Sequence, residues 1–117
     1  MILNGKAKED FEKWYFENHC SSNIKFEDLL PHHIYDVFGW LYKQSLTIQN
    51  ALIIEFFDSI EIIIQIHNVC DDWWFRVKSK TKTIKSEKYN EYKNRQQATI
   101  QAIEKANDLY NSRYENV

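Results

Sequence analysis

The fold is decided by residues 59–84, which read SIEIIIQIHNVCDDWWFRVKSKTKTI. In this stretch alone the side-chain pattern repeats at every second position, as it does along a strand with one buried face. One face of its first half is entirely apolar and consists of Ile60, Ile62, Ile64 and Ile66. We therefore expect an antiparallel β-hairpin whose isoleucine face is covered by helices.

The second half of this stretch alternates more strictly, and residues 68–72 between the two halves are expected to form the turn. Three apolar side chains point to the isoleucine side, namely Trp73, Phe75 and Val77. The other side carries one large aromatic residue and a row of cations, namely Trp74, Arg76, Lys78, Lys80 and Lys82. No third strand is predicted, and a sheet of two strands is marginal unless helices cover it.

Apolar periods of three and four residues predict helices on both sides of the hairpin. The first runs from residue 5 to about residue 20 with Asn4 as its cap, and the polar cluster 21–23 follows as a loop. Residues 32–58 indicate two helices, or one helix broken near 45–47, with Pro31 at the first helical position. Gly39 weakens the first of these or marks the close approach of another element. The second, residues 46–58, is apolar almost all round and should be buried.

The last and longest predicted helix spans residues 86–115. Together these elements predict an α+β fold in one domain, residues 1–117, with N-terminal helices, a central hairpin at about 59–84 and a long C-terminal helix. The composition agrees, because 44% hydrophobic residues with only two glycines and one proline argue against disorder. The charge is uneven, with a balance of −7 over residues 1–72 and +5 over residues 73–117.

The location follows from the cysteines and the hydropathy. Cys20 and Cys70 are too few for a disulfide framework, and the N-terminus MILNGKAKEDF has no secretory pattern. No stretch approaches the roughly 18 apolar residues of a spanning helix. We therefore expect free thiols and a cytoplasmic protein without a membrane segment.

Metal binding is not favoured by the spacing of the possible ligands. The pairs His19–Cys20, His32–His33 and His67–Cys70 supply ligand types for zinc, but no paired Cys-x-x-Cys or His-x-x-x-His unit occurs. Scattered residues of this kind are usually surface imidazoles and small buried thiols. We therefore predict no metal and no cofactor.

Catalysis would need side chains that lie far apart in the sequence to converge. A nucleophilic site would place Cys20 or Cys70 beside His33 or His67, with Asp36 or Asp71 orienting the ring, and no local signature supports it. The carboxylates Glu55, Asp58 and Glu61 are more simply explained by the end of a helix and the entry into a strand. We therefore predict that the protein is not an enzyme, and a small Cys/His enzyme is the third alternative.

The strand side with Trp74 and the cations is the candidate binding surface. An exposed tryptophan is a typical anchor of a protein interface, and a row of Arg and Lys suits a phosphate backbone, most of all that of single-stranded nucleic acid. The alternatives are structural. Lysines on an exposed strand prevent edge-to-edge aggregation, Glu61 is available as a cross-strand partner, and Trp74 could lie across the stems of its own strand.

Three segments resemble short proteins of phages and prophages of Bacteroidetes-type bacteria that have no known activity. They are Gly5-Lys6-Ala7-Lys8-Glu9-Asp10-Phe11-Glu12-Lys13-Trp14-Tyr15, Phe56-Phe57-Asp58-Ser59 and Ala102-Ile103-Glu104-Lys105-Ala106-Asn107-Asp108-Leu109-Tyr110-Asn111, about a third of the chain. The chain departs from this group at Ser59-Ile60-Glu61, where a glycine is expected, and residues 32–45 match nothing. The resemblance implies a phage or mobile-element origin and transfers no functional residue.

These observations lead to one expected function and one alternative. We expect a non-catalytic phage or mobile-element accessory protein that binds a host protein, as an inhibitor of a host defence system, in the cytoplasm of a bacterial host. The expected interface is Trp74, Arg76, Lys78, Lys80 and Lys82. The alternative is nucleic-acid binding through the same strand, and the oligomeric state is left open.

Overall fold

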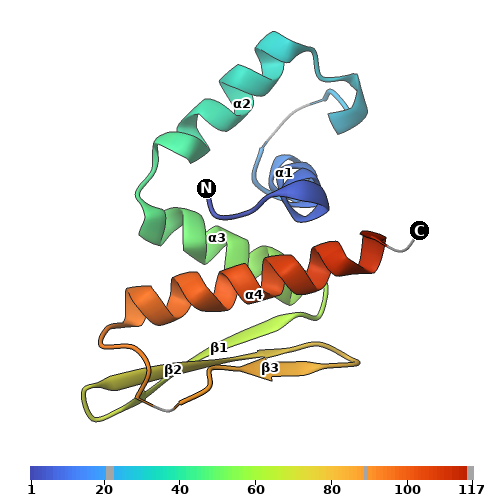
Figure 1. Cartoon of the computed structure of the whole chain (residues 1–117). Helices are drawn as coiled ribbons and strands as arrows, with labels where there is room; N and C mark the ends of the chain where they lie inside the picture. The colour runs from blue at the N-terminus through green and yellow to red at the C-terminus, as the bar shows by residue number, and fades with distance from the viewer. Residues whose placement is uncertain (21–22, 89, 116–117) are drawn as a thin grey trace.

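The computed structural model describes residues 1–20, 23–88 and 90–115 and confirms the α+β fold (Figure 1). A group of helices comes first, then a sheet, then one long helix. In chain order the elements are α1 (Gly5–His19), the short 3-10 helix η1 (Phe26–Asp28), α2 (Pro31–Lys43), α3 (Leu46–Ser59), β1 (Ile63–Val69), β2 (Asp72–Lys78), β3 (Thr83–Lys85) and α4 (Arg95–Glu115).

The sheet is antiparallel in the order β1-β2-β3, and α3 and α4 cover one of its faces (Figure 1). Ile64 pairs with Val77 and Ile66 with Phe75, so the isoleucine face and the apolar side of β2 point the same way. Ile62, Phe75 and Val77 are buried beneath the helices. The predicted inner face of the hairpin and the helices that cover it are therefore confirmed.

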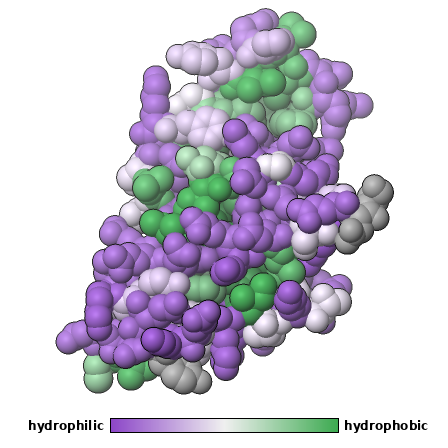
Figure 2. Space-filling view, viewed as in Figure 1, coloured by the Kyte–Doolittle hydropathy of each residue, from purple (hydrophilic) through white to green (hydrophobic). Residues whose placement is uncertain are grey.

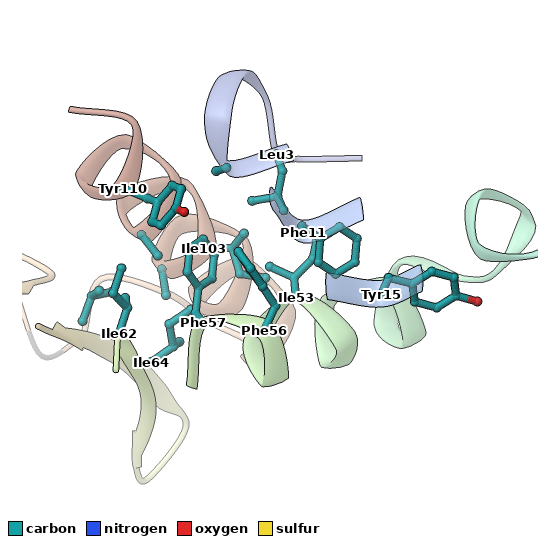
Figure 3. Close-up of a cluster of buried hydrophobic side chains, with 14 of the residues drawn as sticks. Leu3, Phe11, Tyr15, Ile53, Phe56, Phe57, Ile62, Ile64, Ile103 and Tyr110 are labelled. Carbon is teal, nitrogen blue, oxygen red and sulfur yellow. The ribbon is translucent and has the colours of Figure 1, made fainter. Parts of the chain in front are cut away.

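Phe57 of α3 lies at the centre of the core, between the sheet and α4 (Figure 3). Its side chain is fully buried, and its ring meets that of Tyr110 at a centroid distance of 6.4 Å and an interplanar angle of 66°. Its backbone carbonyl accepts a hydrogen bond from the N–H of Ile62, just before β1. One residue thus connects α3, α4 and the start of the sheet.

The sheet differs from the predicted hairpin at both ends. The first strand begins at Ile63, because α3 continues to Ser59 and Glu61 turns the chain with φ of +65°. The second strand ends at Lys78, where Ser79 closes a tight turn by accepting from the N–H of Lys82 and donating to its carbonyl. The sheet therefore has three strands where two were predicted.

The predicted start of the C-terminal helix is wrong. The helix begins at Arg95 and not at residue 86, and Asn94 caps it by accepting from the N–H of Gln97 at 2.9 Å. Before that point Ser86 and Tyr92 continue the pairing along β2, and the N–H of Trp73 donates to the carbonyl of Tyr92. Tyr89, which was placed on this helix, lies outside the described residues, as do Ser21 and Ser22 of the predicted loop.

Helix α1 begins at Gly5 as expected, but Asn4 does not cap it. Its side-chain oxygen accepts from the amides of Asn107 and Asn111 on α4, and Asn111 in turn accepts from the N–H of Ala7 at 2.8 Å. The N–H of Asn4 donates to Asn107. We call these three asparagines the amide clamp. Gly5 is required beside it, because its φ is +59° and an added Cβ would lie 3.1 Å from the Asn111 amide.

The middle helices begin where the sequence predicts. Pro31 is the first residue of α2, and the side chain of Ser45 caps α3 by accepting from the N–H of Ile48. The chain therefore breaks into two helices at Gln44 and Ser45. No other element approaches Gly39, because an added Cβ would meet nothing within 4 Å among the described atoms. The interpretation of Gly39 as a point of close approach is wrong.

Candidate binding surfaces

The face of the sheet away from the helices carries part of the predicted interface. Trp74, Arg76 and Lys78 of β2 point to this outer face, because their neighbours Phe75 and Val77 are buried on the inner one. Lys80 and Lys82 lie in the turn between β2 and β3 and not on a strand. The five predicted residues are therefore neighbours along the chain, but only three of them share a strand face.

Trp74 is half-buried, whereas the predicted interface expected an exposed ring. Its indole ring stacks on the imidazole of His67, its partner across the strands, at a centroid distance of 4.1 Å and an interplanar angle of 18°. The guanidinium of Arg76 lies 5.6 Å from the centroid of the same ring. Because these neighbours occupy part of its surface, Trp74 is a weaker candidate for the anchor of an interface than an exposed ring would be.

Lys80 has the partner that the sequence offered. Its ammonium lies 2.7 Å from Glu61 and both side chains are exposed. The hydrogen bond and the charge of Glu61 raise the pKa of Lys80. An exposed pair of this kind adds little to stability, but it neutralises one cation of the predicted row.

The sheet adds a cation that the predicted interface did not include. Lys85 of β3 pairs with Arg76 in the register, and Lys78 lies two residues further along β2. Arg76, Lys78 and Lys85 therefore form one row across two strands, which we call the cation row. The basic residues of the sequence continue to Lys85, but the predicted interface stopped at Lys82, because β3 was not predicted and nothing placed Lys85 beside Arg76.

The histidines and cysteines do not converge. Among the described residues no hydrogen bond joins a cysteine to a histidine, and no group of three His, Cys, Asp or Glu side chains is placed to hold a metal ion. Partial burial raises the pKa of the Cys20 thiol, which leaves less of the nucleophilic thiolate at neutral pH. His19 lies 3.5 Å from Glu55. His33 accepts from the N–H of Leu30.

Large apolar side chains are exposed at the outer end of α2, and sequence reasoning did not identify them. Leu30 is 53% exposed, Ile34 44% and Tyr35 75%. We call these three residues the α2 tip. Helix α2 lies at the end of the molecule opposite the sheet, and its buried residues are Phe38 and Leu41 (Figure 1). Figure 2 shows hydrophobic residues gathered at this end of the molecule.

The outer side of α3 is a second apolar surface, although the sequence predicted that this helix is buried. Ile48 is 42% exposed, Ala51 is exposed, and Leu52 and Ile54 are half-buried. We call these four residues the α3 surface. Trp40 of α2, 56% exposed, stands beside it. The prediction failed on this side because α1, α4 and β1 pack mainly against the opposite side of the helix, whose buried residues are Gln49, Asn50, Ile53, Phe56 and Phe57.

One signal in the sequence could have revealed both surfaces. Helices 31–43 and 46–59 carry more apolar residues than one buried stripe can hold, and the excess must face either another layer or solvent. None of the helices among the described residues is long and apolar enough to cross a membrane.

Comparison with known proteins adds no family to these surfaces. No protein-family model matches the chain, and no curated protein or solved structure is significantly similar to it.

Proposed function

We propose that the protein is non-catalytic and acts by binding another protein. The observation that supports this most is the α2 tip, where three large apolar side chains are exposed in and just before the first turns of a helix that lies away from the sheet. Exposed apolar residues in one place are typical of protein interaction sites. Tyr35, the most exposed, has the large rigid side chain that binding hot spots favour.

The resemblance to phage proteins narrows the proposal. In this narrower form the partner is a host protein, the chain is a phage or mobile-element accessory protein in the cytoplasm of a bacterial host, and its binding inhibits a host defence system. The support for this form is the resemblance alone. The protein-binding function itself rests on the exposed side chains and does not depend on it.

The proposal predicts that replacing the exposed side chains of the α2 tip abolishes binding of the partner. The double variant Ile34→Ser with Tyr35→Ser should retain at most about a tenth of the protein captured from a lysate of a Bacteroidetes-type bacterium, because truncating a hot-spot residue costs 2 kcal/mol or more. Captured proteins are quantified by mass spectrometry. Asp36→Ser, exposed on the same helix, is the matched control and should capture as the wild type does.

The same capture experiment tests the predicted interface on the sheet. If Trp74→Ala with Lys78→Glu loses the partner while the α2 variant keeps it, the binding site is on the outer face of the sheet. If no variant changes the set of captured proteins, the protein-binding proposal is wrong. Thermal unfolding of each variant confirms that it remains folded.

Nucleic-acid binding is the second candidate, and the cation row favours it. Arg76, Lys78 and Lys85 are neighbours on the face of the sheet away from the helices, and a row of cations of this kind can follow the phosphates of a single strand. With three phosphate contacts, the logarithm of the binding constant should fall with the logarithm of salt concentration with a slope of about −2. Titration of fluorescent single-stranded and duplex oligonucleotides measures this slope. Absence of binding at low salt excludes the candidate.

A further inference from the structure

The exposed side of α3 is organised in two stripes. Thr47, Ala51, Ile54 and Asp58 follow one another at intervals of three and four residues, and Ile48, Leu52 and Glu55 form a parallel stripe beside them. The first stripe faces α4, and the second faces α2 and the end of α1. Each stripe has apolar residues at its centre, Ala51 with Ile54 and Ile48 with Leu52, and ends in an acidic residue. The two ends of the exposed side of α3 therefore differ, because the acidic residues lie toward its C-terminal end.

Two shallow hollows flank the helix. One, of about 180 Å³, lies between Ile54 and the first turn of α4 at Arg95. The other, of about 310 Å³, lies between Leu52 and Trp40. Ala51 borders both, so the smallest side chain of the surface stands at its middle with a hollow on either side. A small residue at this place allows a second helix to approach closely, with its larger side chains in the hollows.

The two ends of the α3 surface carry opposite charges. Arg95 borders the hollow at the first turn of α3, next to Thr47. Asp58 stands at the last turn, on the same stripe as Ile54 and therefore on the same side of the helix as Arg95. Neither Asp58 nor Arg95 makes an ion pair among the described residues, although Arg95 lies over the ring of Trp73 at 5.1 Å.

Asp58 is in an environment that disfavours its charge. Neighbouring protein partly excludes water from its carboxylate although the residue is exposed, and this burial, followed by the charge of Glu55, raises the pKa of Asp58. His19 lies near Glu55 and not Asp58. A cation brought to Asp58 from outside would favour the ionised carboxylate.

We propose that the α3 surface binds the α3 surface of a second copy of the chain, with the two helices antiparallel about a two-fold axis near Ala51. This arrangement places Asp58 of each copy against Arg95 of the other, and Ile48 of each against Leu52 of the other. A parallel arrangement would bring like charges together. The α3 surface, together with Asp58 at one end and Arg95 of α4 at the other, supplies both charges and both hollows, which is the self-complementarity that a two-fold interface requires.

The inference goes beyond the proposed function and is independent of it, because the α2 tip lies outside the α3 surface. α3 has 14 residues and is about 21 Å long. An interface built on one such helix belongs to the small class of less than about 1,200 Å² and should be weak. Association should therefore appear between about 10 µM and about 1 mM protein.

Sedimentation velocity over this concentration range tests the proposal with the full chain. The wild type should shift from monomer to dimer as its concentration rises. Asp58→Arg and Arg95→Asp should each remain monomeric, since each places like charges together at both ends of the interface. The variant that combines them should dimerise again. Glu104→Arg, an exposed position on α4, changes the net charge as Asp58→Arg does and should behave as the wild type.

Three results would overturn the proposal. The first is a wild type that stays monomeric throughout the range. The second is a dimer that Asp58→Arg leaves intact, which would point to another contact such as the free edge of β1. The third is a combined variant that stays monomeric, which would contradict the antiparallel pairing. Circular dichroism of each variant shows whether it is folded. If Asp58→Arg does not fold, Arg95→Asp alone still tests the pairing of opposite charges.

Discussion

Phe57→Ala should lower the free energy of unfolding by about 3–5 kcal/mol, the range for a buried phenylalanine replaced by alanine. The ring of Phe57 is fully buried between α3, α4 and β1, and no single neighbour can move to fill its place without disturbing another element. A chain of 117 residues has about 6–18 kcal/mol of stability in total. The variant should therefore remain folded but unfold at a clearly lower urea concentration than the wild type.

Urea unfolding followed by circular dichroism measures this change. Tyr35→Ala is the matched control, because it removes an aromatic ring that is 75% exposed and should alter stability by no more than about 0.5 kcal/mol. A loss of less than about 1 kcal/mol for Phe57→Ala would contradict the place of Phe57 at the centre of the core.

The second large effect is expected in the amide clamp. Replacing Asn107 and Asn111 together by alanine should lower the free energy of unfolding by about 1.5–3 kcal/mol, because the lost cap on the N–H of Ala7 costs about 1–2 kcal/mol and the lost hydrogen bond from the N–H of Asn4 costs about 0.5–1.5 kcal/mol. Asn107 is only 4% exposed. The two losses should not be fully additive, since both amides bind Asn4.

Amide hydrogen exchange locates this effect. In the double variant the first turn of α1, including the N–H of Ala7, should lose protection more than the sheet does, because α1 loses its only cap among the described residues. Ser112→Ala, an exposed change on the same helix, is the control. Equal loss of protection in the sheet and α1 would show that the clamp stabilises the whole fold and not this helix.

The fold was predictable where the sequence pattern is local. The alternation around Ile64 and Phe75 predicted the inner face of the sheet, Pro31 predicted the start of α2, and the break in the apolar period at 45–47 predicted the start of α3. What failed depends on contacts between distant residues. The turn 79–82 contains neither glycine nor proline to mark it, and Tyr92 leaves the helical pattern because it pairs with Trp73.

The candidate surfaces were predicted less well than the fold. The sequence predicted the aromatic and basic side chains on the outer face of β2. It did not predict that Trp74 is partly covered, because the covering ring belongs to His67 on the neighbouring strand. It also placed apolar residues on α2 and α3 without indicating which of them lack a partner. Exposure is a property of the packed molecule, and an apolar residue such as Tyr35 has the same pattern in the sequence whether or not another layer covers it.

The amide clamp has a consequence for the order in which the molecule folds. The hydrogen bonds that complete the start of α1 come from residues more than 100 positions later in the chain. During synthesis α1 therefore emerges long before the groups that hold its first turn, and it cannot reach its final stability until α4 has been made. Contacts of such long range slow folding and leave early segments exposed, so a ribosome-bound chain that stops before α4 should be sensitive to proteases and a target for chaperones.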